Sequence, residues 1–190
     1  MYISRQQLLD RYNAGERNFA GIQFYVVRTE ASKENIFLLC DVDLSNIILS
    51  GVYLKYIGLR GSNLRGAKLV GAYMHQVNLS DVDLSDADLT GAVLRDVCLN
   101  RANLTRAKLI GAQLIRTKLL EADLTGADLS DSILCQVGFS RVKIDESVQS
   151  RKIYCPNAVL WQMRMADGTY IEGPQTAEDM RKSSKKLNNE

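Results

Sequence analysis

The sequence predicts an all-β fold, a solenoid of short-sided coils with a short helix at its N-terminal end. Every fifth residue from Leu39 to Ile144 is large and apolar, at 22 positions without a miss. Two residues before each lies a smaller one, usually Ala or Val. A period of five fits neither a helix nor a plain strand. A chain that turns a corner every five residues keeps both series inside, and four sides close a coil of about 20 residues. Coils stacked about 4.8 Å apart then share a core that one coil cannot bury.

The five-residue unit has a recurrent composition, as in segments 87–91 and 122–126, which both read Ala-Asp-Leu-Thr-Gly. This pattern resembles the pentapeptide-repeat family, and the resemblance covers residues 37–146 without interruption. It implies a right-handed quadrilateral β-helix and, for most members, no known biochemical role. Segment 8–19 and the ending Met165-Ala166-Asp167-Gly168-Thr169 resemble cyanobacterial members, which include regulators of heterocyst patterning, although Ala166 stands where proline is usual.

Residues 1–16 are expected to form an N-terminal cap. Ser4 and Gln7 fit a capping box, and Ile3 with Leu8 fits a hydrophobic staple. The pattern predicts a helix over about 5–13 that ends before a glycine. The apolar face of this helix should cover the first coil, because an open β-helix end is an unpaired sheet edge.

The rest of the chain divides into three segments. Residues 17–146 should form the β-helix, with an irregular loop near 28–35 that is either a tolerated insertion or a binding loop. Residues 147–174 are expected to close the C-terminal end, where the apolar pattern resumes one residue out of phase at Ala158 and Leu160. Residues 175–190 are polar and basic, and such a composition predicts a disordered tail.

Composition and charge restrict the function. The chain has 190 residues, with 24 Lys and Arg against 22 Asp and Glu, a net charge of +2. Residues 37–146 hold 12 basic and 13 acidic residues, so no strong field of either sign is expected. No targeting segment or apolar run long enough to span a membrane is visible, which favours the cytoplasm. The four cysteines lack metal-ligand spacing and are expected to be reduced thiols.

Stacking of the coils sorts the outward side chains into ladders. One ladder alternates Asp and Asn, which keeps like charges apart: Asp43, Asn63, Asp83, Asn103 and Asp123. The next alternates Lys and Asp below Ile48 and predicts a salt ladder: Lys68, Asp88, Lys108 and Asp128. The glycines at 51, 71, 91 and 111 share one corner and predict a turn with positive φ.

A third side is apolar and aromatic, with basic residues at its upper end. Tyr and Arg are favoured where proteins bind partners, and contiguous exposed apolar patches mark contact surfaces. The alternative is that aromatic and β-branched residues simply favour stacked strands. The candidate protein-contact face comprises Tyr53, Lys55, Tyr56, Tyr73, His75, Val93, Arg95, Ile115 and Ile133.

No residues are arranged for catalysis. His75 lies between Lys55 and Arg95 with no nucleophile and no orienting carboxylate in its own ladder, and Asp83 and Asp88 project from different sides. We therefore expect no enzyme activity, cofactor, metal, nucleic acid or small-molecule substrate. The favoured function is a non-catalytic module that binds an unidentified protein. The alternatives are a DNA-mimic inhibitor of an enzyme such as gyrase, which neutral charge disfavours, and a self-associating structural protein such as a homodimer.

Overall fold

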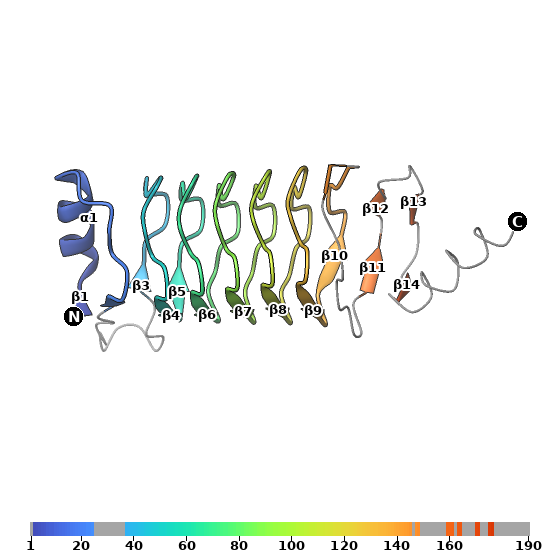
Figure 1. Cartoon of the computed structure of the whole chain (residues 1–190), viewed down its shortest axis with the longest axis horizontal. Coiled ribbons are helices and arrows are strands. Elements are labelled where there is room, and N and C mark those ends of the chain that lie inside the picture. Colours follow the sequence, from blue (N-terminus) through green and yellow to red (C-terminus); the bar gives the residue numbers. More distant parts are fainter. Residues whose placement is uncertain are drawn as a thin grey trace, which may run out of the picture.

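The computed structural model describes residues 2–24, 37–145 and 147–148, and beyond them the backbone of four short strands. In the described part of the chain, one helix and fourteen short strands follow one another along the axis of a coil, and the strands up to β11 pair in parallel (Figure 1). Their bounds up to residue 140 are β1 (Tyr2–Ile3), α1 (Arg5–Asn13), β2 (Gln23–Phe24), β3 (Phe37–Leu38), β4 (Tyr53–Lys55), β5 (Ile57–Gly58), β6 (Tyr73–His75), β7 (Val93–Arg95), β8 (Gln113–Ile115), β9 (Ile133–Cys135) and β10 (Gly138–Ser140).

Between residues 37 and 143, four parallel ladders join residues 20 apart. We number the four sides in chain order, starting after the corner at Asp41, and identify each side by one bridge between neighbouring coils. Side 1 contains the bridge Asp43–Asn63, side 2 Ile48–Lys68, side 3 Tyr53–Tyr73 and side 4 Gly58–Asn78. Side 3 is the most regular sheet, with the strand order β1-β2-β4-β6-β7-β8-β9. The predicted quadrilateral β-helix is confirmed, and so is the predicted length of its coils.

The core follows the five-residue period. All large apolar residues of the series from Leu39 to Phe139 are at most 5% exposed, and Ile144 is partly buried. The smaller series packs beside them, with Ala67, Ala87 and Ala107 fully buried. Each coil therefore contributes four large and four smaller side chains to one continuous core, as the period predicts.

Every corner of the coil uses the left-handed backbone region. Each fifth residue from Asp41 to Arg141 has positive φ, whether or not it is a glycine. At the corner of Gly91 the Ala92 amide donates to the Leu89 carbonyl at 3.0 Å, as in a turn whose third residue is left-handed. The prediction for the glycines 51, 71, 91 and 111 is confirmed, with φ of 63–66°.

Helix α1 covers the N-terminal end of the stack (Figure 1). Ser4 and Gln7 form the predicted capping box, and the helix spans the predicted residues. Leu8 and Tyr12 are buried against the first coil, and the Tyr12 hydroxyl donates to the Ser45 carbonyl at 2.8 Å. The helix is too short to cross a membrane, and none of the described residues forms a helix that could.

The ladder register records an insertion in the first coil. Gln23 pairs with Tyr53, thirty residues on, whereas Phe37 pairs with Ile57 at the usual twenty. Ten extra residues therefore lie between Phe24 and Phe37. The loop predicted near 28–35 falls in this interval and lies outside the described residues.

At the C-terminal end, β11 (Val159–Trp161) continues the stack by pairing in parallel with β10. Phe139 pairs with Leu160 at a spacing of 21, which confirms the shift of one residue in the apolar pattern. Strand β12 (Met163–Arg164) pairs antiparallel with β13 (Tyr170–Ile171). Two residues of the predicted tail form β14 (Gln175–Thr176), which pairs antiparallel with β11, and residues 177–190 lie outside the described residues.

Candidate protein-binding face

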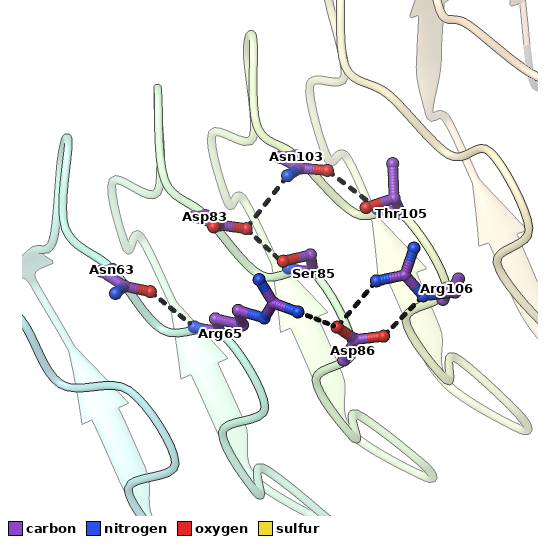
Figure 2. Close-up of polar contacts among 8 residues, drawn as sticks. All are labelled: Asn63, Arg65, Asp83, Ser85, Asp86, Asn103, Thr105 and Arg106. Carbon is purple, nitrogen blue, oxygen red and sulfur yellow. Dashed lines mark hydrogen bonds and ion pairs between the residues drawn. The ribbon is translucent and has the colours of Figure 1, made fainter.

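The Asp or Asn before a central Leu accepts a hydrogen bond from its own turn. On side 1, Asp83 Oδ1 accepts from the Ser85 amide at 2.9 Å, and Asn103 Oδ1 accepts from the Thr105 amide at 3.1 Å (Figure 2). Asn103 Nδ2 also donates to Asp83 Oδ1 at 3.1 Å, which links neighbouring coils. The predicted Asp/Asn alternation is confirmed, and its amide groups donate where a second carboxylate would repel.

The salt ladder predicted on side 2 is wrong. Lys68, Asp88, Lys108 and Asp128 stack in register, yet no ion pair joins these four described residues. Asp88 and Asp128 instead accept hydrogen bonds from the amides two residues on, at 3.0 and 2.9 Å. The bond to the own turn does not by itself explain this absence, since Asp123 accepts from the Thr125 amide and still pairs with Lys143 of the next coil at 2.7 Å.

Ion pairs form at the corners, where sequence analysis did not look for them. The Arg106 guanidinium binds both oxygens of Asp86, at 2.7 and 2.8 Å, and Arg65 approaches Asp86 from the other side at 3.4 Å (Figure 2). The same arrangement places Asp81 between Arg60 and Arg101. Each aspartate thus lies between one arginine from the coil before and one from the coil after.

A third corner of the same coil repeats this design with an imidazole. Arg116 binds both oxygens of Asp96 at 2.6 Å, and His75 Nδ1 lies 3.7 Å from Asp96 Oδ2. The Arg116 hydrogen bond is the main cause that lowers the pKa of Asp96 below its usual value. Hydrogen bonds from Arg101 and Arg106 likewise lower the pKa of Asp81 and Asp86.

The structure places a carboxylate near His75, outside the ladder of residues in which the sequence shows none. Asp96 lies at the corner of the next coil, one residue after Arg95, which is the ladder partner of His75. Pairing residues that are twenty apart therefore does not bring Asp96 to His75. His75 is half-buried, and its Nδ1 has no hydrogen-bond partner. Asp96 is already held by Arg116, and no Ser or Cys of the described residues forms a hydrogen bond with the imidazole.

Side 3 brings the predicted aromatic residues together at its N-terminal half. Tyr53 and Tyr73 stack in parallel, with ring centroids 4.9 Å apart and ring planes 2° apart. Tyr56 at the adjacent corner has its ring 6.2 Å from that of His75, and the Lys55 ammonium lies 4.8 Å from the Tyr56 ring centroid. Tyr53 is 52% exposed and Tyr56 42%. The rings therefore lie on the surface, where they add nothing to the shared core.

The structure adds Tyr2 to this face. Tyr2 pairs with Gln23, which pairs with Tyr53, so Tyr2 begins the same outward column two strands earlier. It is 66% exposed, the largest value among the large apolar residues of the described part of the chain. Sequence analysis missed Tyr2 because the helix and the ten-residue insertion interrupt the regular spacing between it and Tyr53.

The C-terminal half of side 3 differs from this aromatic part. Val93, Ile115 and Ile133 occupy their predicted ladder positions but are half-buried rather than exposed. Arg95 is exposed. Elsewhere exposed apolar side chains occur one at a time, as Leu38, Val70 and Leu120. We call the aromatic and basic part of side 3 the tyrosine face: Tyr2, Tyr53, Tyr56 and Arg95, which are exposed, with the half-buried Tyr73, Lys55 and His75 beside them.

Features expected of an enzyme are scarce in the described residues. No group of three His, Cys, Asp or Glu among them could hold a metal ion. Cys40, Cys98 and Cys135 are free thiols, and Cys155 lies outside the described residues. A hollow of about 400 Å³ lies beside the tyrosine face, with Gln76, Asp96, Cys98, Arg116 and Lys118 in its lining. Its one carboxylate is the Asp96 that Arg116 already binds.

Comparison with known proteins identifies the class to which this four-sided solenoid belongs. The family model described as pentapeptide repeats matches eight copies, over residues 59–96 and 98–136. The chain belongs to the pentapeptide-repeat family. Proteins of this family are generally structural or interaction modules. No curated protein matches the chain.

Several solved structures are similar to parts or most of the chain. HetL, a protein involved in heterocyst differentiation regulation from the cyanobacterium Nostoc, is 22% identical over 88% of this chain and 99% of its own, with a TM-score of 0.38. A pentapeptide repeat protein of the Arabidopsis thaliana thylakoid lumen is 37% identical over 49% of this chain and 68% of its own, with a TM-score of 0.40. QnrB1, a plasmid-mediated fluoroquinolone resistance protein, is 16% identical over 98% of this chain and 94% of its own, also at 0.40.

Proposed function

We propose that this protein is a non-catalytic binding module that presents the tyrosine face of a rigid rod to a partner protein. The observation that carries the proposal is the column of Tyr2, Tyr53 and Tyr73 with Tyr56 at its corner, in which Tyr73 is half-buried and the other three rings are exposed. A regulatory role in a cyanobacterium, suggested by the resemblance of both ends of the chain, is part of the proposal.

Energetic considerations support a binding role for these rings. The core of each coil is already filled by the inward series, so the outward tyrosines are not needed for its packing. Tyrosine carries a large apolar area and a hydroxyl with few rotatable bonds, and it is enriched where proteins bind partners. The backbone beneath the rings is held by parallel ladders on both sides, so little entropy is lost when a partner docks.

DNA mimicry is the main alternative that the sequence leaves open. A DNA mimic needs unpaired negative charge along its length. Here the three corner aspartates, Asp81, Asp86 and Asp96, are each bound by an arginine through both carboxylate oxygens. The acidic and basic residues of the coils also balance. These observations favour protein binding through aromatic residues.

Affinity capture with matched variants tests the proposal. The bait carrying Tyr53→Lys and Tyr73→Lys should lose a partner that wild type holds from a lysate of the source organism. The control bait carries Val70→Lys and Leu120→Lys, which place the same two charges at exposed apolar positions of other sides. It should retain the partner. Circular dichroism must show the same β signal for all three baits.

Two outcomes would contradict the proposal. If all three baits hold the same partner, the tyrosine face is not the contact surface. If wild type associates only with itself, as light scattering after gel filtration would show, the self-associating structural protein replaces the binding module. Loss of the partner by the tyrosine variant alone supports the proposed function.

A further inference from the structure

We propose that the occupant of the tyrosine face is an acidic segment of the partner protein, whose carboxylates bind Arg95 and Lys55. This inference rests on the proposed function and specifies the chemistry of its partner. It follows from Arg95 and Lys55 of side 3, which form no ion pair with a described residue and lie beside the exposed tyrosines.

Arg95 differs from the other arginines of the coils. Seven arginines lie between residues 37 and 145, and six of them form ion pairs: Arg60, Arg65, Arg101, Arg106, Arg116 and Arg141. Arg95 forms no ion pair with a described residue, although it is exposed. Its ladder neighbours are His75 and Ile115, which carry no carboxylate. The next residue, Asp96, accepts hydrogen bonds from Arg116 with both of its carboxylate oxygens. The charge of Arg95 is the last of several causes that lower the pKa of Asp96.

Lys55 lies in the same outward column two coils before Arg95, with His75 between them. Its ammonium lies 4.8 Å from the Tyr56 ring centroid and forms no ion pair with a described residue. Two strand spacings separate Lys55 from Arg95, a distance of about 10 Å. The column thus presents two basic groups along the coil axis, immediately beside the stacked rings of Tyr53 and Tyr73.

Charge complementarity therefore selects an acidic occupant. A carboxylate placed against either basic group makes a direct ion pair that no described residue of this chain now supplies, and complementary charge steers association. Lys68 and Lys108 of side 2 likewise form no ion pair with a described residue, but their ladder neighbours Asp88 and Asp128 carry carboxylates. The column beside the tyrosines combines basic groups with exposed apolar area, so it would hold acidic residues interleaved with apolar ones.

A nucleic acid fits this face less well than an acidic polypeptide. Single-stranded nucleic acids bind by stacking bases on aromatic rings above a basic groove. Tyr53 and Tyr73 already cover one face of each other, and their 4.9 Å separation leaves no slot for a base between them. Two basic groups also neutralise too few phosphates to hold a strand at physiological salt.

Binding to a random copolymer of glutamate and tyrosine tests this inference, since the copolymer samples many spacings of acidic and aromatic residues. The full-length protein is immobilised and titrated with the copolymer, and Lys55→Gln with Arg95→Gln should weaken binding about tenfold. The matched control is Lys68→Gln with Lys108→Gln. It removes two basic residues that are also two coils apart and form no ion pair with a described residue, and it should bind like wild type.

The outcomes separate this inference from the proposed function. Failure of wild type to bind the copolymer, or an equal loss in both variants, would overturn the acidic occupant. Tighter binding of oligothymidylate than of the copolymer would also overturn the acidic occupant, if the variant with Lys55→Gln and Arg95→Gln loses the binding of oligothymidylate. If Lys55→Gln with Arg95→Gln still captures the lysate partner that the tyrosine variant loses, the binding module stands and the acidic occupant does not.

Discussion

The role of each polar residue depends on its place in the five-residue unit. An Asp or Asn before the central Leu bonds to the amide two residues on, as Asp128 does with Ser130, and so stabilises its own turn. The residue two places after the central Leu stands at a corner with positive φ. From there an arginine reaches the corner carboxylate of the coil before it, as Arg101 reaches Asp81. The corner aspartates therefore join neighbouring coils, and the aspartates before the central Leu stabilise their own turns, although Asp123 does both by accepting also from Lys143.

Asp86→Asn should destabilise the protein at neutral pH by removing the ion pair with Arg106. Asn tolerates the left-handed backbone of this corner, so the change acts on charge rather than on conformation. The Arg106 hydrogen bond lowers the pKa of Asp86. The stabilisation that this ion pair gives the folded state is then fully present above the pKa of an aspartate in the unfolded chain, about 3.9. It is lost as pH falls through the lower pKa of Asp86 in the folded state. Urea midpoints measured from pH 7 to pH 2 should differ at neutral pH and converge in acid.

Asp131→Asn is the control for this experiment. Asp131 also occupies a left-handed corner, with φ of 58°, but forms no ion pair with a described residue. Its urea midpoint should follow wild type across the whole pH range. A midpoint difference for Asp86→Asn that persists at pH 2 would show that the loss is conformational and that the ion pair with Arg106 contributes nothing.

At the scale of elements, the N-terminal helix solves a problem that the coils create. The first coil exposes apolar ends of its core and the unpaired edge of its ladders. Helix α1 covers the apolar ends with Leu8 and Tyr12, and the Tyr12 hydroxyl satisfies the Ser45 carbonyl. Arg17 fixes the exit of the helix, because its guanidinium packs on the Tyr12 ring at 3.9 Å and donates to the Tyr12 carbonyl. The cap and the chain that leaves it thus form one packed unit.

Leu8→Ala should lower the free energy of unfolding by about 2–5 kcal/mol, because it opens a cavity between the helix and the first coil. Leu8 is fully buried in the same core cluster as Leu44 and Phe19. Leu9→Ala makes the same chemical change one residue on, at a partly buried position, and should cost clearly less. Urea denaturation followed by circular dichroism measures both. Equal losses would mean that α1 is held by its capping box and termini rather than by the packing of Leu8.

At the scale of the whole molecule, the fold was predictable from the sequence because one period sets both the core and the corners. A large residue every fifth position admits few chain paths, and the ladders, the core and the helix α1 all follow the predicted scheme. Side 3 was predictable for the same reason, since residues one coil apart must stack. The placement of Tyr53 over Tyr73 therefore needed no information beyond the spacing.

Two features of the site were not predictable by that scheme. Tyr2 joins the tyrosine column only because β1 pairs with β2 and because ten extra residues separate Phe24 from Phe37, which the periodic pattern does not encode. The ion pairs at the corners lie outside the ladders of the residues before the central Leu. Some join residues twenty apart, as Arg101 and Asp81 do, and others join residues twenty-one apart, as His75 and Asp96 do. Alternating charges twenty residues apart thus form ion pairs at the corners and none among the described residues in the ladder of side 2.

The stack as a whole should be stabilised coil by coil, since each coil contacts only its neighbours along the axis. Phe139→Ala acts near the C-terminal end of the described coils, and Leu104→Ala acts in the middle; both residues are buried. We expect Phe139→Ala to speed amide hydrogen exchange in residues 119–145 while residues 59–98 keep wild-type protection. Leu104→Ala should lower protection on both sides of its coil and reduce the unfolding free energy by about 2–5 kcal/mol. Exchange measured by mass spectrometry separates the two patterns.

Uniform loss of protection in Phe139→Ala would instead mean that the stack unfolds as one unit. The tyrosine face would then lose its support whenever either end of the rod opens.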